Sequence, residues 1–169
     1  MKKFTTLLLS SVLLVSVAAC SNNTEKTSAD APDTTQASPQ APAADSAQTT
    51  QKDAQSEVRR QQLNSDIRAK EQRNNAVNNG SAQNRDEGAL ASEVRSKLEA
   101  NIPAGELVIK GEDNGTVTVS GTVPTQQQLA KIAPLAKQIK GVKAVNVKAT
   151  VAPAKPDNSK NNTNNSKAQ

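Results

Sequence analysis

"NGTVTVSGTV", residues 114–123, decides the fold, because it joins a turn signal to an alternating strand. Its valines share one face with Gly121, while threonine and serine occupy the other face. This period of two predicts a strand at 116–123 with one core face and one wet face. Asn-Gly is a strong hairpin signal, and the β-branched run "ELVIK" at 106–110 predicts the partner strand.

Two helical patterns flank this hairpin. After Asp86, a candidate N-cap, leucine and valine recur every four residues, which predicts a helix that Asn101 and Pro103 close. Thr125 begins a capping box, and apolar residues then repeat at helical spacing as far as Gly141. Pro134 lies inside this second helix and predicts a bend, because proline removes a backbone hydrogen bond.

A third strand follows the second helix. Valine and alanine alternate with polar residues over 145–151, which predicts a strand with one apolar face. The order is helix, strand, strand, helix, strand. The expected fold is therefore an α+β, two-layer αββαβ sandwich with a three-stranded sheet on two helices, preceded by a long disordered linker.

"VTVSGTV" at 117–123 and "GVKAV" at 141–145, with a helix between them, resemble the BON domain (bacterial OsmY and nodulation). The resemblance covers residues 86–152 as a single copy and departs from the family at Asn146, an asparagine placed one residue early. It implies an envelope protein, periplasmic or lipid-anchored, connected with osmotic stress, outer-membrane integrity and phospholipid surfaces. The positions that carry the family motif are Val119, Gly121, Val123, Gly141, Val142 and Val145.

The N-terminus has the layout of a signal peptide. A basic start precedes an apolar run that is too short to span about 30 Å of hydrocarbon. Small residues end this run, and Ala19-Cys20 resembles the cleavage site of a bacterial lipobox. We therefore expect a lipoprotein signal peptide at 1–19 and a diacylglyceryl group, with palmitate-type acyl chains, on Cys20, the only cysteine of the chain. An ordinary secretory cleavage site is the alternative.

Polar, low-complexity sequence lies on both sides of the predicted domain. Residues 20–85 are expected to form the lipidated cysteine and a disordered linker, whose coil reach would be about 45 Å. Within this linker, 56–73 has helix-forming composition, but its apolar stripe is thin, and whether it forms a helix stays open. Residues 153–169 are expected to be a disordered tail.

The composition excludes several classes of function. Phe4 is the only aromatic residue and leaves with the signal peptide, so stacking on single-stranded nucleic acid is not expected. The chain has no histidine, and its one thiol is expected to be acylated, so the usual parts of a catalytic or metal site are missing. We expect a non-enzymatic protein with no cofactor and no metal site. Potassium binding, known in some BON proteins, stays open.

Charge is polarised within the predicted domain. Residues 86–113 carry seven acids and three bases, whereas 131–148 carries five lysines and no acid. These lysines are expected to contact anionic phospholipid or, in a second interpretation, a periplasmic protein; a merely solvated face is the third. Position 21, directly after the cysteine, is serine instead of the aspartate that retains lipoproteins at the inner membrane, so the outer membrane is favoured. The five lysines are Lys131, Lys137, Lys140, Lys143 and Lys148.

Overall fold

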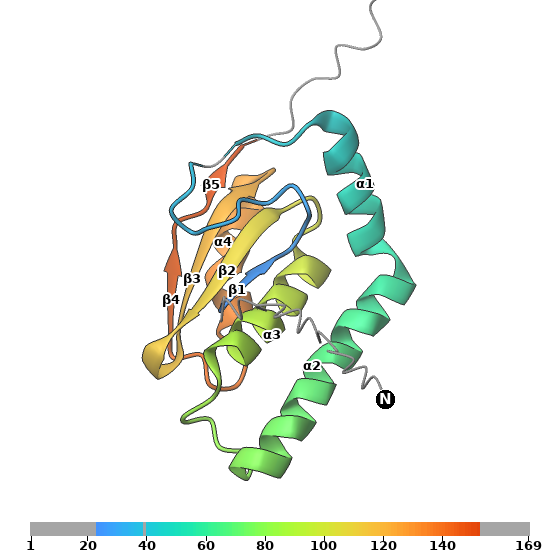
Figure 1. Ribbon diagram of the computed structural model, residues 1–169. Coiled ribbons are helices and arrows are strands. Elements are labelled where there is room, and N and C mark those ends of the chain that lie inside the picture. The colour runs from blue at the N-terminus through green and yellow to red at the C-terminus, as the bar shows by residue number, and fades with distance from the viewer. Residues whose placement is uncertain (1–22, 39, 153–169) are drawn as a thin grey trace, which may run out of the picture.

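The computed structural model describes residues 23–38 and 40–152 and confirms the mixed α+β class (Figure 1). A mixed sheet has the strand order β1-β2-β3-β4, and β5 also pairs with β3. The predicted signal peptide and the predicted tail from residue 153 lie outside the described residues. The elements are β1 (Thr24–Lys26), α1 (Ala44–Gln55), α2 (Glu57–Asn78), α3 (Glu87–Asn101), β2 (Glu106–Glu112), β3 (Thr116–Val123), α4 (Gln126–Ala136), β4 (Ala144–Val147) and β5 (Thr150–Val151).

The β2–β3 hairpin forms as predicted. The two strands are antiparallel, and Ile109 lies opposite Val119. The turn requires left-handed backbone at both predicted positions, with φ of 61° at Asn114 and 78° at Gly115. Asparagine and glycine are the residues that tolerate this conformation best, and the structure confirms the turn that they predict.

The helices α3 and α4 cover one face of the sheet. Asp86 caps α3 by accepting a hydrogen bond from the backbone N–H of Ala89 at 2.7 Å, as predicted. Thr125 caps α4 in the same way, accepting from the Gln128 N–H at 3.2 Å. The core lies between these helices and the sheet, and its fully buried members include Leu90, Val94, Leu98, Ile109, Val119 and Ile132.

The C-terminal part of the sequence differs from the prediction in two details. α4 ends at Ala136 instead of continuing to Gly141, and the chain after it forms tighter turns, in which the Gln138 N–H donates to the Leu135 carbonyl and the Ile139 N–H to the Ala136 carbonyl. The third strand is split into β4 and β5, both parallel to β3. Ala149 between them is buried, but Val147 and Val151 remain 39% and 37% exposed, since they lie at the edge of the sheet.

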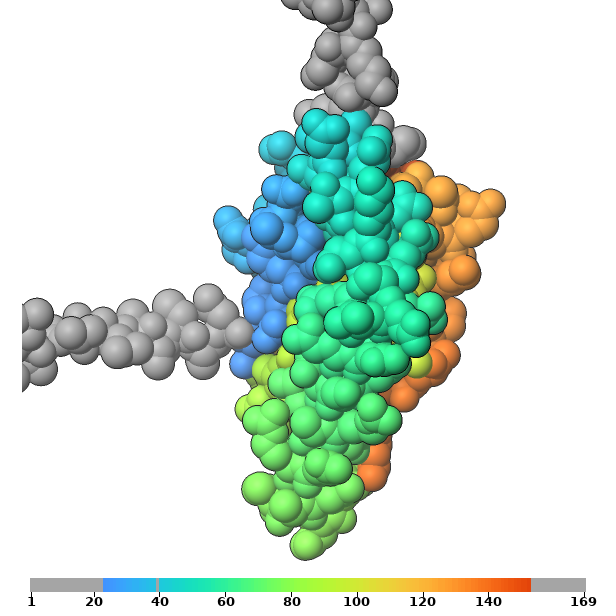
Figure 2. All heavy atoms as spheres, turned by 90° about the vertical axis from the view of Figure 1, so that its right-hand side faces the viewer, coloured from blue at the N-terminus to red at the C-terminus, as the bar shows by residue number. Residues whose placement is uncertain are grey.

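The predicted disordered linker does not hold for the described residues before 79, which fold onto the domain. β1 pairs antiparallel with β2 and adds an edge strand that the prediction of three strands lacks. The segment 56–73, left open by the sequence, lies in α2, which packs on α3 (Figure 1). Figure 2 shows α1 and α2 together covering one side of the molecule.

The physical reason is that α2 needs little apolar surface of its own. Leu63 is fully buried and Ile67 packs against the core, but the facing side of α3 is polar. Glu93 and Ser96 are fully buried there, and Glu99 is 5% exposed. Charged pairs between distant residues hold the two helices together, and such pairs leave no periodic pattern in a sequence.

The second face of the sheet is buried, although the sequence predicted that it would be wet. Thr118, Ser120 and Thr122 are each 2% exposed. The segment 27–40 runs across this face (Figure 1), and the Thr122 hydroxyl donates to the Gln40 carbonyl at 3.3 Å. The Thr118 hydroxyl also has a partner, the Glu112 carboxylate at 3.1 Å, whereas the Ser120 hydroxyl is buried without one. Alternation therefore marks the polar face without showing that solvent reaches it.

Candidate functional site

The residues of the family motif have structural positions. Val119 and Val123 are fully buried, and Val142 and Val145 pack against the core. Gly121 has a φ of +109°, and a Cβ there would lie 2.1 Å from the Glu106 carbonyl oxygen. Gly141 has a φ of +96°, and a Cβ there would lie 2.6 Å from Cδ of Arg85. These positions therefore maintain the fold, and none of them presents a reactive group.

The five predicted contact lysines are all exposed, and none forms an ion pair with the described residues. Lys140 and Lys143 flank the Gly141 turn, where the Lys143 N–H donates to the Gly115 carbonyl at 2.8 Å. Lys131 lies in α4, Lys137 caps its C-terminus, and Lys148 lies between β4 and β5. The structure therefore brings Lys140 and Lys143 close to one turn and distributes the other three over different elements.

An arginine that the sequence did not single out forms the most buried ionic cluster. Arg85 has 2% of its side chain exposed and contacts Glu71 of α2 and Glu93 of α3, each at 2.5 Å. Its guanidinium also donates to the Lys140 carbonyl at 2.8 Å. One side chain thus joins α2, α3 and the turn after α4. Arginine suits this position because its planar fork donates several hydrogen bonds at once.

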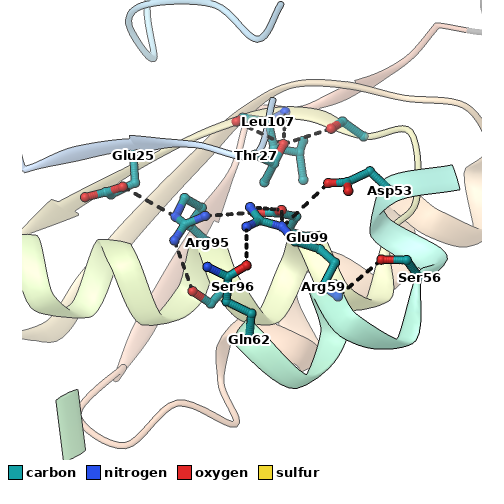
Figure 3. Close-up of polar contacts among 11 residues, drawn as sticks. Glu25, Thr27, Asp53, Ser56, Arg59, Gln62, Arg95, Ser96, Glu99 and Leu107 are labelled. Carbon is teal, nitrogen blue, oxygen red and sulfur yellow. Dashed lines mark hydrogen bonds and ion pairs between the residues drawn. The ribbon is translucent and has the colours of Figure 1, made fainter. Parts of the chain in front are cut away.

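A second ionic network lies at the other end of α3 (Figure 3). Glu99 accepts from Nε of Arg59 in α2 at 2.7 Å and from Nη1 of Arg95 at 2.8 Å. Arg95 also contacts Glu25 of β1 at 3.4 Å, and Arg59 contacts Asp53 of α1 at 3.6 Å. The network therefore connects α1, α2, α3 and β1. It holds in place the same elements that the sequence predicted to be a linker.

Two buried carboxyl groups have raised pKa values. Burial raises the pKa of Glu93 to about 7, although the positive charge of Arg85 acts in the opposite direction. Burial, with a smaller contribution from Asp30, raises the pKa of Glu106 to about 7. Glu106 begins β2 on the face that the segment 27–40 covers. Both groups lie where the N-terminal part of the chain packs on the sheet or on α3.

A cavity of about 440 Å³ lies between α2, the start of α3 and β1. Its walls include Lys70, Arg73 and Val77 of α2, Glu25 of β1 and Gly88 of α3. Lys70 and Arg73 form no ion pair with the described residues, whereas Glu25 is paired with Arg95. The walls therefore supply two unpaired positive charges. Sequence reasoning missed this site, since no local pattern indicates that α2 lies against α3.

The predicted lipid-attachment and cleavage residues, Cys20 and Ala19, lie outside the described residues. Their prediction stays untested by the structure. Asn23 is the first described residue. Its carbonyl accepts from the Gly111 N–H at 2.8 Å, and its side chain donates to Glu87. Across the described ranges, no helix combines the length and the apolar character needed to span a membrane. Nor do their acidic side chains gather into a group suited to hold a metal ion.

Residues 86–153 match the family model described as BON domain, a match that includes α3, both strands of the hairpin, α4, β4 and β5. This confirms the resemblance read from the sequence, with a single copy of the domain. The family consists of non-enzymatic binding domains that associate with membranes and phospholipids in the bacterial envelope and occur in osmotic-stress proteins. No curated protein and no solved structure matches the chain.

Proposed function

We propose, on the premise that residues 86–153 form a BON domain, that this chain is a lipoprotein anchored through an acylated Cys20. Its domain binds phospholipid or other envelope components and supports envelope integrity or the response to osmotic stress. The match to the BON family is the observation that carries this proposal. The outer membrane is the favoured location, because Ser21 follows the cysteine where an inner-membrane retention signal would place aspartate.

The anchor and the domain are closer together than a disordered linker would place them. Only three residue steps separate Cys20 from Asn23, which allow a reach of about 10 Å. Asn23 and β1 are hydrogen-bonded to β2, so an acyl group on Cys20 would hold the folded domain close to the membrane surface. This arrangement supports a function at the membrane surface and replaces the reach of about 45 Å that the sequence suggested.

Metabolic labelling with a fatty-acid probe, followed by membrane fractionation, tests the anchor. We expect the wild-type chain to be labelled and to sediment with membranes, and Cys20→Ser to lose the label. Mass spectrometry that finds a free thiol on Cys20 in the native protein would overturn the proposal. Replacing the five contact lysines by glutamine tests whether they add electrostatic attraction to anionic vesicles, each contributing on the order of 1 kcal/mol.

A second candidate function is docking of a periplasmic protein. The observation in its favour is the exposed edge formed by β4 and β5, where Val147 and Val151 are partly exposed and, within the described residues, β4 pairs only with β3. An unpaired edge accepts an extended strand from another chain. Crosslinking from Val147 in intact cells distinguishes the two functions: a protein adduct that persists in Cys20→Ser favours docking, and its absence favours the membrane.

A further inference from the structure

We propose that the cavity between α2 and α3 binds the anionic headgroup of a membrane phospholipid, with Lys70 and Arg73 as the residues that contact the phosphate. This inference rests on the proposed function, because the acylated Cys20 is what brings the cavity to the membrane. It goes beyond that function by assigning a binding site, and by assigning it to α2, which lies outside the region that matches the family.

The short chain before β1 limits the distance between the cavity and the acylated Cys20. Asn23 lies beside Gly88 of the cavity wall, because a Cβ added to this glycine would lie 3.6 Å from the Asn23 side-chain oxygen. Glu25, two residues further along, is itself part of the wall. With about 10 Å of chain between Asn23 and the acylated residue, the cavity lies at the depth of lipid headgroups.

Charge complementarity selects the occupant. Lys70 is partly buried and Arg73 is exposed at the rim, and neither forms an ion pair with a carboxylate among the described residues, although the charge of Lys70 acts on the buried Glu93. Of the acidic groups of the wall, Glu25 pairs with Arg95, whereas Asp86 caps α3 by accepting from the N–H of Ala89 and keeps its negative charge. Arg85 also reaches the wall, but Glu71 and Glu93 already satisfy its charge. Among the charged wall groups without an ion-pair partner in the described residues, Lys70 and Arg73 outnumber Asp86, which favours an anion.

The size and rim of the cavity agree with a lipid occupant. About 440 Å³ accommodates a phosphate with its glycerol and headgroup, and the cavity opens to the outside. Val77, which is 87% exposed, lies at the rim, where an apolar side chain would contact the acyl boundary instead of water. A lipid that carries both a phosphate and a hydrocarbon chain meets both features, whereas free phosphate meets only the first.

Nitroxide labels at the two ends of α2 test the inference. Val77→Cys lies at the cavity, and Val58→Cys is a matched control, because Val58 is also an exposed valine, at 78%, about 28 Å away along the same helix. The full acylated chain is placed in vesicles that contain phosphatidylglycerol or only phosphatidylcholine. Relaxation of each label by Ni²⁺ held on chelating lipids reports its distance from the headgroups.

We expect strong relaxation at Val77→Cys, weak relaxation at Val58→Cys, and an increase at Val77→Cys when phosphatidylglycerol is present. Lys70→Gln with Arg73→Gln should reduce the docking equilibrium constant by roughly 25-fold, since each cation near an anionic surface contributes a factor of about five. Arg60→Gln with Arg68→Gln removes the same charge from the same helix outside the cavity walls and should leave the signal unchanged.

The possible failures are separable. A chain without acyl groups on Cys20 overturns the proposed function and this inference with it. An acylated chain whose two labels relax equally overturns the cavity site and leaves the anchor intact. A signal at Val77→Cys that ignores both phosphatidylglycerol and the Lys70/Arg73 substitutions overturns the headgroup site while confirming the orientation that the short tether imposes.

Discussion

Replacing Glu106 by glutamine should stabilise the protein at neutral and alkaline pH. Glu106 is 5% exposed, and its carboxyl lies under the segment 27–40, near Asp30. Its pKa is raised from 4.5 to about 7 in the folded state, first by burial and then by repulsion from Asp30. A folded state that holds a proton more tightly than the unfolded state loses stability as pH rises between these two values.

The magnitude follows from the size of the shift. A rise from 4.5 to about 7 corresponds to a destabilisation of about 3 kcal/mol above pH 7, at 1.36 kcal/mol per pKa unit. Glutamine has nearly the same shape and no charge. The variant should therefore equal the wild type near pH 4 and exceed its free energy of unfolding by about 2–3 kcal/mol at pH 8.

Urea melts followed by far-ultraviolet circular dichroism measure this difference at pH 4, 6 and 8. The chain has no tryptophan or tyrosine, so intrinsic fluorescence is not an option. Asp30→Asn should give a smaller stabilisation with the same pH dependence, because Asp30 is the lesser cause. Asp66→Asn, at a partly exposed position of α2, is the control and should change stability by less than about 0.5 kcal/mol. Parallel curves for Glu106→Gln and wild type from pH 4 to 8 would refute the burial of this carboxyl.

Four further substitutions test the packing. Arg85→Leu should cost about 3–5 kcal/mol in urea melts, because it leaves the buried Glu93 and the half-buried Glu71 without their partner; a loss below 1 kcal/mol would contradict the cluster. Val119→Asp should abolish the cooperative transition, since it places a charge in the core; a retained transition would mean that the faces of β3 are reversed. Gly121→Ala should cost at least about 2 kcal/mol, because of its positive φ and the close Glu106 carbonyl; a neutral result would contradict this backbone geometry. Arg59→Ala should reduce hydrogen-exchange protection in α2 while β2 and β3 keep theirs; equal loss everywhere would show that the helix and the sheet unfold as one unit.

The sequence predicted the elements whose signals are local. Asp86 and Thr125 cap helices within three residues of themselves, and Asn114-Gly115 specifies its turn without help from the rest of the chain. The same applies to the alternation in β3, which positions its own side chains. Propensity, capping and periodicity act over a few residues, and a single sequence displays them directly.

The elements that were missed depend on partners far away in the chain. Arg59 contacts Glu99 across forty positions, and Thr27 donates to the Gly105 carbonyl across seventy-eight. Neither pair has a local pattern, so β1, α1 and α2 looked like a linker by composition. The cavity was missed for the same reason. Cys20 is the opposite case, because its prediction rests on a local motif that the described residues do not include.

The pairing of β1 with β2 has a consequence for the order in which the chain folds. Thr24 finds its place only opposite Lys110, so the segment that is synthesised first must wait until eighty-six further residues have been made. The C-terminal half then acts as a template on which the earlier half condenses. A recombinant fragment that begins at residue 86, where the match to the family begins, would lack β1, α1 and α2. It would expose the edge of β2 together with the acidic side of α3, and would be expected to aggregate where the longer chain stays monodisperse.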